Sequence, residues 1–425
     1  MSRRVVITGL GVVAPNGVGL EAYEKALRGG VSGIRHIPLL DELNFGCRVA
    51  GVPQGVDAVA EERFDEDELR AMNSNHRFGC IAALDAWADA GFERPAHDDD
   101  HVFWEAGAVI GTGIGGLDTA GEKLIPLTDA GKVRRLGSTT VEQIMGSGVS
   151  ARVSGLLALG NQVTSNSSAC STGAEAVVEG YRRIQDGLAE RMLCGGSEGS
   201  SHYIWAGFDS MRVLCRNFND QPERASRPMS ATAAGFVPGS GAGILHLESL
   251  ESAEARGARI YAEVLGGALN CGGHRGGGSM TAPNPESVRR CIRQAVEAAG
   301  VSPDEIDAIN GHLTATGADA GEVASWAAAL GRTPENFPAI TSTKSMIGHG
   351  LGSAGAMESV ACILMLHGGF VHPSINSEDV HPDIADFSAA IPQQELEMPK
   401  LRTLIKAGFG FGDVNVCVVF RKWDS

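Results

Sequence analysis

The sequence lacks any pair of cysteines at CxxC spacing, lacks a long hydrophobic run, and carries fewer basic than acidic residues. Its nine cysteines are an odd number and no signal-peptide pattern precedes them, so we expect reduced thiols in a cytoplasmic protein and no disulfide framework. The longest apolar runs, such as Val360–Leu366, are too short to cross a bilayer. A formal net charge of −16 argues against nucleic acid or an anionic membrane surface as the main partner.

Glycine is abundant, with 57 among 425 residues, and a hydrophobic content of 43% allows a large core or two fused halves. The stretch from the end of a predicted helix at Leu27 to about Leu69 is irregular in pattern. Elsewhere the periodicity predicts helices at Leu20–Leu27, at His76–Ala90, between Cys170 and Gly187, at Glu286–Ala299 and up to His367. It predicts strands at Val5–Thr8, Ala106–Ile110, Arg191–Cys194, Ile244–Glu248, Ile260–Gly266, Ile306–Asn310, up to Ile340, Arg402–Lys406 and Val414–Phe420. Strands alternating with helices in both halves predict a layered α/β fold built from two similar units.

Two glycine clusters match the dinucleotide-binding fingerprint in spacing but not in context. The first, with Gly9 and Gly11, runs into the turn Pro15–Gly17, where the fingerprint needs an uninterrupted helix. The second, Gly111–Leu117, has no helix signalled directly after it and no acidic residue ending a second strand about 20 residues on. We interpret both clusters as places where backbone or substrate packs closely, which leaves an NAD(P)-dependent oxidoreductase as a minor alternative.

Cys170 has the setting of a catalytic nucleophile. A polar segment of small residues leads up to it, and a helix then begins, with Ala174, Val177 and Tyr181 on one face. The positive end of a helix dipole favours the thiolate, which is the nucleophilic form of cysteine. Covalent catalysis therefore competes with the alternative of a buried structural thiol.

Two histidines share a second pattern. His312 and His349 each follow a predicted strand and lie in a loop rich in small and hydroxyl residues. A lone histidine in a loop is usually structural, but two in such settings together with a helix-capping cysteine favour a site. The glycine-rich turn Gly408–Gly412 has two interpretations. It either presents backbone N–H groups to a pocket lined by Phe409 and Phe411, or it is a plain hairpin turn whose aromatic side chains lie in the core.

A series of segments, in this order and spacing, resembles the β-ketoacyl-acyl-carrier-protein synthases, the condensing enzymes of the thiolase fold. The segments are VVITGLGVVAPNG, GTGIGGL, SACSTGAEAV, ASRP, GARIYAEVLG, MTAPNP, STKSMIGHGLGSAGAMES and GFGFGDVN, and they run nearly from end to end. GGFVHPSIN is most similar to the type I/II elongating branch. The resemblance implies a duplicated αβαβα core, with the nucleophile in a half at residues 1–250 and the two histidines in a half at 251–425.

The same resemblance implies a ping-pong, decarboxylating Claisen condensation that uses no metal and no other cofactor. Cys170 would carry the acyl chain as a thioester, while His312 and His349 would stabilise the enolate formed from malonyl-acyl carrier protein. The backbone N–H groups of Cys170 and Phe411 would form the oxyanion hole. Matching positions assign supporting roles to Lys344, Glu358, Asp319 and Glu322, and acyl-pocket or gate roles to Ile114, Phe409 and Phe411.

The sequence departs from the family pattern in several loops. Leu313 follows His312 where the family has glycine, so it must either fit without a positive φ or displace the backbone. The family's Asp-x-x-Glu survives as Asp319 and Glu322 only if one residue is deleted, and Asp413 stands in the closing glycine turn. The three catalytic positions are unchanged, so the departures bear on the substrate, and a specialised fatty-acid or polyketide-like pathway is an alternative to bulk synthesis.

Acyl carrier protein is the partner that the resemblance implies. That carrier is acidic, as this chain is, so recruitment needs a local basic patch. The candidates are Arg63, Arg70, Arg77, Arg212, Arg216 and Arg224. The alternative for each of them is an ordinary solvated arginine. The family forms homodimers by pairing the strand before the nucleophile, here about Gln162–Ala169, across a two-fold axis.

Two other functions stay open. A thiolase-like acyl-CoA enzyme would use a second cysteine near the C-terminal glycine turn, but Cys417 lies inside the strand after that turn. A non-catalytic, chain-length-determining partner of a ketosynthase heterodimer would have lost its nucleophile, whereas Cys170, His312 and His349 are all present.

Overall fold

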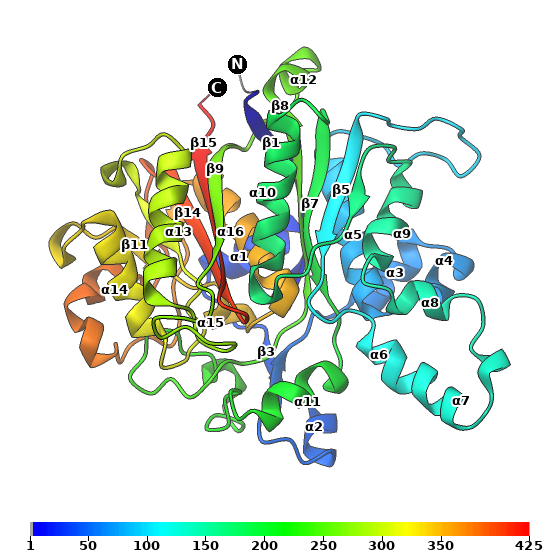
Figure 1. The fold of residues 1–425 in the computed structure, drawn as a ribbon, viewed down its shortest axis with the longest axis horizontal. Coiled ribbons are helices and arrows are strands. Elements are labelled where there is room, and N and C mark those ends of the chain that lie inside the picture. Colours follow the sequence, from blue (N-terminus) through cyan, green and yellow to red (C-terminus); the bar gives the residue numbers. More distant parts are fainter. Residues whose placement is uncertain (1–2, 425) are drawn as a thin grey trace.

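One path of hydrogen-bonded strands crosses the molecule (Figure 1). The computed structural model describes residues 3–424, and within them eleven strands form a sheet in the order β11-β10-β14-β15-β9-β1-β8-β7-β5-β6, with β2 paired to β1. These strands are β1 (Val5–Ala14), β2 (Gly17–Val18), β5 (Ala106–Gly111), β6 (Val163–Thr164), β7 (Arg191–Glu198), β8 (Gly241–Ser249), β9 (Ala262–Cys271), β10 (Ala308–Asn310), β11 (Ala339–Thr341), β14 (Thr403–Gly410) and β15 (Val414–Lys422). Two small antiparallel two-stranded sheets pair β3 (Ile34–His36) with β4 (Val49–Gly51), and β12 (Phe370–Val371) with β13 (Leu396–Glu397).

The two ends of this sheet repeat one pairing pattern. β5 pairs in parallel with β6 and β7, β7 pairs antiparallel with β8, and β8 pairs antiparallel with β1. In the same way β10 pairs in parallel with β11 and β14, followed by antiparallel β15 and β9. The layered α/β fold built from two similar units is therefore confirmed. The strands divide between β8 and β9, near the expected boundary of the halves 1–250 and 251–425, and the independence of those halves as domains stays a prediction.

The helices lie between and outside the two halves of the sheet (Figure 1). The central helices α10 (Thr172–Gln185) and α16 (Ala354–Gly368) pack against each other and against strands of both halves. Helices α5 (Ser74–Asp89) and α9 (Gly148–Leu157) cover the N-terminal half, and α13 (Pro285–Ala298) and α14 (Asp319–Leu330) lie against the C-terminal half. The shorter helices are α1 (Leu20–Arg28), α2 (Pro38–Glu42), α3 (Val56–Arg63), α4 (Glu66–Arg70), α6 (Leu117–Thr119), α7 (Ile125–Asp129), α8 (Thr140–Ile144), α11 (His202–Ser210), α12 (Leu250–Ala255) and α15 (Lys344–Ile347).

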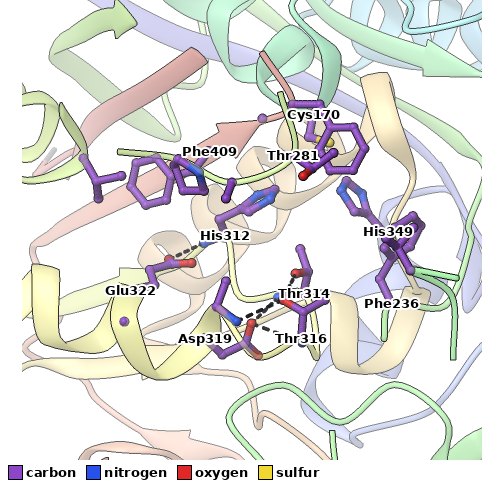
Figure 2. A pocket seen from close by; sticks show the side chains of 18 of the residues that line it. Cys170, Phe236, Thr281, His312, Thr314, Thr316, Asp319, Glu322, His349 and Phe409 are labelled. Carbon is purple, nitrogen blue, oxygen red and sulfur yellow. Dashed lines mark hydrogen bonds between the residues drawn. The ribbon is translucent and has the colours of Figure 1, made fainter. Parts of the chain in front are cut away.

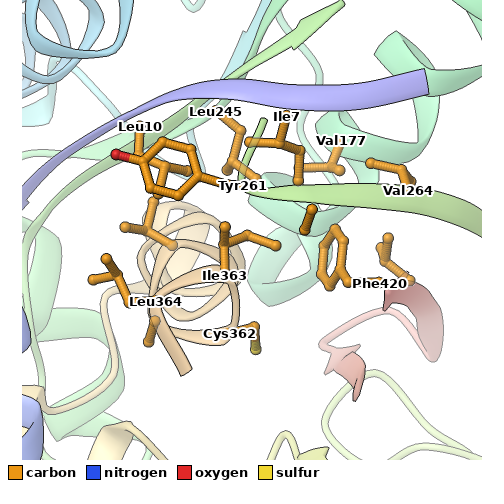
Figure 3. Close-up of a cluster of buried hydrophobic side chains, with 14 of the residues drawn as sticks. Ile7, Leu10, Val177, Leu245, Tyr261, Val264, Cys362, Ile363, Leu364 and Phe420 are labelled. Atoms are coloured by element: carbon orange, nitrogen blue, oxygen red, sulfur yellow. The ribbon is translucent and has the colours of Figure 1, made fainter. Parts of the chain in front are cut away.

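The main core surrounds the two central helices (Figure 3). Val177 of α10 and Ile363 of α16 are fully buried there, together with Ile7 of β1 and Phe420 of β15. Each buried aliphatic side chain contributes about 1.5–3 kcal/mol, so packing against strands of both halves stabilises α10 and α16 in place. The stretch Leu351–Gly368 has the length and hydropathy of a membrane span, but 89% of it is buried inside the molecule, as in a core helix.

Each predicted helix and strand has a counterpart, with ends displaced by a few residues. The prediction of an irregular stretch up to Leu69 is wrong, because it contains β3, β4 and the short helices α2, α3 and α4. Elements of three to eight residues carry too few side chains to establish a period.

Neither glycine cluster forms a nucleotide loop. Gly9 and Gly11 lie inside β1, where a Cβ atom would collide with the backbone of α5 at Ala86 and Ala82, so close packing is the reason for glycine. The prediction that no helix follows the second cluster is wrong, since α6 begins at Leu117. The N–H groups of that cluster are nevertheless taken by a protein carboxylate, described below.

Candidate active site

Cys170 lies in a 3₁₀ turn, Ala169–Ser171, that leads directly into α10. Ala169 has a left-handed φ of 51°, a conformation that costs a non-glycine residue about 1 kcal/mol and marks a strained turn. Hydrogen bonds from the Ser171 hydroxyl to the Gly408 and Val414 carbonyls hold the turn against the C-terminal glycine-rich segment. The chain folds here so that the nucleophile lies between the two halves.

The Cys170 thiol is buried, with 9% of the residue exposed. Burial raises its pKa to about 11, although the Phe411 backbone and the Lys344 cation act in the opposite direction. The expectation that the helix end favours the thiolate is therefore wrong, because burial disfavours the charged form and raises the pKa of Cys170. Cys170 is therefore a thiol at neutral pH, and its proton must leave during the reaction.

His312 and His349 face Cys170 from the two loops that follow β10 and β11 (Figure 2). One ring nitrogen of each histidine and the Cys170 sulfur all lie within 4.8 Å of one another. Burial, and next the Lys344 cation, lower the pKa of both histidines well below the ordinary value, so both rings are neutral near pH 7. These three sequence-predicted residues are thus brought together.

The tautomer of His349 follows from one hydrogen bond. Its Nδ1 atom accepts the backbone N–H of Leu351 at 3.1 Å, so the proton of the neutral ring resides on Nε2. A protonated nitrogen donates hydrogen bonds and does not ligate a metal. The Cys-His-His set therefore fits hydrogen bonding to a substrate oxygen better than it fits zinc.

The loop after His312 is organised by two carboxylates from the first turn of α14. Glu322 accepts the backbone N–H groups of His312 at 2.6 Å and Leu313 at 2.8 Å. Asp319 accepts those of Thr314 and Ala315, each at 3.0 Å (Figure 2). Both carboxylates reach the loop despite its shortened sequence, which is a supporting arrangement for His312.

Leu313 fits this loop by adopting a positive φ, so the expected alternative of a negative φ does not hold. Leu313 has a φ of 26° and Ala315 a φ of 64°, and both are fully buried. Burial raises the pKa of Glu322 to about 7, and the neighbouring Asp319 charge adds to this rise. The loop thus combines strained backbone with buried acceptors that compensate for it.

Lys344, at the start of α15, connects the two histidine loops. Its ammonium group donates to the His312 carbonyl at 2.7 Å and forms an ion pair with Glu358 Oε1 at 2.5 Å. The other Glu358 oxygen pairs with Lys406 of β14 at 2.8 Å. Sequence reasoning missed Lys406, and its signal was a single charged residue inside the apolar strand TLIKAGFG.

A cavity of about 400 Å³ opens in front of Cys170 and the two histidines. Phe409 and Phe411 line it, as expected, and apolar side chains dominate its wall. Threonine hydroxyls and further aromatics complete the lining at Phe208, Phe236, Thr281, Thr314 and Thr316. Ile114 is 38% exposed and does not line this cavity, so its role in an acyl pocket stays a prediction.

Another buried carboxylate lies at the second glycine cluster. Glu198, at the end of β7, accepts N–H groups from Gly113 at 2.8 Å, Ile114 at 3.0 Å and Gly352 at 2.9 Å. A negative charge in this cluster of donors excludes a phosphate from it. The oxidoreductase alternative has no support here.

Most of the candidate carrier-protein arginines are paired with acidic side chains. Arg63, Arg70 and Arg77 lie on α3, α4 and α5, while the others follow α11 (Figure 1). Five of the six pair with acidic side chains, at Asp85, Asp67, Asp57, Asp209 and Glu378. Arg212 has no ion pair within residues 3–424, and the patch as a whole stays a prediction.

Family models for the beta-ketoacyl synthase N-terminal and C-terminal domains match residues 2–253 and 261–378. A curated relative, the 3-oxoacyl-[acyl-carrier-protein] synthase 2 of Synechocystis sp., is 36% identical over 99% of this chain and 98% of its own. Among solved structures, the ishigamide ketosynthase/chain length factor is 32% identical with a TM-score of 0.88, and both chains are covered completely. A type II PKS acyl-carrier protein in complex with its ketosynthase, AntDE:AntF, gives 30% identity, complete coverage of both chains and a TM-score of 0.87.

Proposed function

The chain belongs to the beta-ketoacyl synthase family and has its thiolase fold, and on that premise we propose that its cavity performs the decarboxylating condensation of 3-oxoacyl-acyl-carrier-protein synthases. It is an acyltransferase that joins an acyl primer to the two carbons supplied by malonyl-acyl carrier protein. The observation that carries the proposal is the convergence of Cys170, His312 and His349 within 4.8 Å at one end of an apolar cavity. The pathway is fatty-acid synthesis or a specialised polyketide-like one.

In the first half-reaction the Cys170 sulfur attacks the carbonyl carbon of the acyl-carrier thioester. Addition of the sulfur gives a tetrahedral oxyanion. This intermediate then collapses, the bond to the carrier's sulfur breaks, and the departing sulfur takes up the proton that Cys170 loses. The N–H groups of Cys170 and Phe411 bind the tetrahedral oxyanion, which supplies the stabilisation that such transition states need. Because the Cys170 pKa is about 11, proton removal and attack occur together.

In the second half-reaction malonyl-carrier protein enters the same cavity and loses CO₂. The electron pair of the broken carbon–carbon bond becomes an enolate, whose oxygen accepts hydrogen bonds from His312 and from the Nε2–H of His349. The enolate carbon then attacks the carbonyl carbon of the Cys170 thioester. The carbon–sulfur bond breaks to give 3-oxoacyl-carrier protein and the Cys170 thiolate, which takes up a proton from solvent. Two neutral donors suit this step because each donates an N–H group to the oxygen on which the negative charge develops.

The proposed assembly is a homodimer that works with acyl carrier protein in the cytoplasm. β6 is the end strand of the sheet and pairs only with β5 among the described strands, so its other edge is available to a second copy. Asn161, in the segment before Cys170, donates hydrogen bonds to the backbone carbonyls of Trp104 and Leu188. The exposed side chains of these two residues add apolar surface near that edge.

The test is the intact mass of wild type and Cys170→Ala after incubation with a panel of acyl-carrier-protein thioesters. We expect an acyl adduct on wild type alone, and the preferred chain reports the length of the pocket. A wild type that forms no adduct with any primer would overturn the proposal and would favour the non-catalytic chain-length partner.

A further inference from the structure

Lys406 is a buried lysine that the chemistry above does not use. It lies in β14, and the strand register places it beside Asn310 of β10, two residues before His312. Its side chain is fully buried. Burying an ammonium group costs several kcal/mol unless it is paired, so its presence needs a reason.

The ion cluster around Lys406 contains two cations and one anion. Glu358 Oε1 lies 2.5 Å from the Lys344 ammonium and Glu358 Oε2 lies 2.8 Å from that of Lys406. Lys406 also donates to the carbonyl of Ala407. All three charged side chains are at most 1% exposed.

The charges of this cluster do not cancel. Glu358 alone neutralises Lys344, so an apolar residue at position 406 would leave a matched buried pair and would avoid the desolvation cost of a second lysine. The cluster therefore contains one more cationic side chain than anionic ones, and it adjoins the loop that holds His312. A merely structural role gives no account of this surplus.

We propose that Lys406 is a positioning residue for the decarboxylation step, because its surplus charge creates a positive potential at the two histidines that favours the malonyl carboxylate and the enolate. The inference rests on the condensation proposed above. It assigns to Lys406 an electrostatic role that none of Cys170, His312 and His349 fills. Lys406 touches no substrate atom and acts through Glu358, Lys344 and the histidine loops.

The Lys406 charge should affect the rates of the two half-reactions differently. Lys406 lies among the cations that lower the pKa of His312 and of His349, after burial and Lys344. The strongest influences on the Cys170 thiol are instead burial, the Phe411 backbone and Lys344. Loss of the Lys406 charge is therefore expected to impair enolate formation and to spare acylation of Cys170.

Other titratable groups lie near this region and enter the pH dependence. They come from the turn before α10 and from α14, α15, α16 and β15, and they are Cys170, Glu322, Lys344, Glu358, Cys362 and Cys417. Lys344 is the other cation in this group, and its own pKa is lowered first by burial. Removing Lys406 raises the pKa of the histidines, so their protonation then begins at a higher pH.

The experiment compares full-length wild type with Lys406→Met, which removes the charge at similar length, and with Lys406→Gln, which keeps a hydrogen-bond donor. Lys422→Met, at a half-buried position of the adjacent strand β15, is the control. Acylation of Cys170 is followed by intact mass, and decarboxylation by CO₂ release from malonyl-carrier protein between about pH 5 and pH 9. Urea unfolding reports whether each variant folds.

We expect both Lys406 variants to release CO₂ at least about tenfold more slowly, with acylation within about threefold of wild type. The acidic limb of CO₂ release should move upward by about one pH unit, while Lys422→Met resembles wild type. Equal loss of both half-reactions, retention of wild-type decarboxylation in either variant, or failure of both variants to fold would overturn the inference. A wild type that neither acylates nor decarboxylates would instead refute the proposed function.

Discussion

The two halves of the molecule hold their parts of the site by different means. The turn that carries Cys170 is fixed by neutral groups, such as the Ser171 hydroxyl on the Gly408 and Val414 carbonyls. The histidine loops are fixed by buried charges, with Glu322 and Asp319 on one side and the Lys344–Glu358 pair on the other. The difference follows the chemistry, since the nucleophile passes from thiol to neutral thioester, whereas the histidine side must receive an anion.

The contributions of the two halves to catalysis can be distinguished by removing the reacting groups of one half at a time. Cys170→Ala should lose condensation by at least about 10³-fold yet still release CO₂ from malonyl-carrier protein, because both histidine donors remain. His312→Ala should form the acyl adduct but lose decarboxylation by about 10²–10³-fold. Intact mass and CO₂ release measure the two steps, and variants that each lose both steps equally would show that the halves do not act separately.

Removing a charge from the histidine half should destabilise the protein far more than removing the nucleophile. Glu358→Leu leaves two buried lysines without a counterion, and we expect a loss of about 3–5 kcal/mol in the free energy of unfolding. Cys170→Ala should change the same quantity by less than about 1 kcal/mol, since no ion pair is broken. Urea titration decides, and a Glu358→Leu protein as stable as Cys170→Ala would contradict the account of the ion cluster.

The neutral character of the nucleophile half can be tested by the pH dependence of Cys170 alkylation. Because its pKa is raised to about 11, the thiolate fraction and the rate of reaction with iodoacetamide should rise about tenfold per pH unit from about pH 7 to pH 9. Mass mapping of the Cys170 peptide gives the rate. A plateau below about pH 8 would mean that the thiolate is stabilised after all.

A smaller effect is expected at Asp413, in the turn between β14 and β15. Asp413 has a φ of 61° and is fully buried, and its carboxylate accepts N–H groups from Asn284 at 2.7 Å and His274 at 3.1 Å. Asp413→Gly relieves the backbone but frees the segment 272–284 that carries Thr281. We expect KM for carrier thioesters to rise about three- to tenfold with a smaller change in kcat.

Amide exchange of the segment 272–284 checks this prediction, and Asp413→Asn, which keeps one acceptor oxygen, is the matched variant. We expect faster exchange in Asp413→Gly and an intermediate rate in Asp413→Asn. Unchanged exchange in Asp413→Gly would show that the carboxylate does not fix the segment.

The sequence predicted what depends on local pattern and motif. The helix after Cys170, the loops of His312 and His349 and the alternation of strands and helices were all predicted, because period and spacing are visible along the chain. The raised pKa of Cys170 was not, because burial depends on segments more than 200 residues away, such as the turn that contains Phe411. The positive φ of Leu313 was left open, because only Glu322 and the surrounding core show what compensates it.

Lys406 shows the same limit most clearly. In sequence it is one lysine in an apolar strand, and only the fold reveals that it shares Glu358 with Lys344. The candidate arginines show the converse, since a charge count finds them but only the structure shows that five are paired.

The central claim is that this cavity makes a new carbon–carbon bond on a carrier-bound substrate. The most direct measurement is the intact mass of the carrier protein after wild type has been supplied with an acyl-carrier thioester and malonyl-carrier protein together. The account predicts a carrier whose mass is that of the 3-oxoacyl product, longer than the primer by two carbons, and no such species with Cys170→Ala. A carrier population that contains only the starting thioesters, or only the decarboxylated acetyl form, would contradict it.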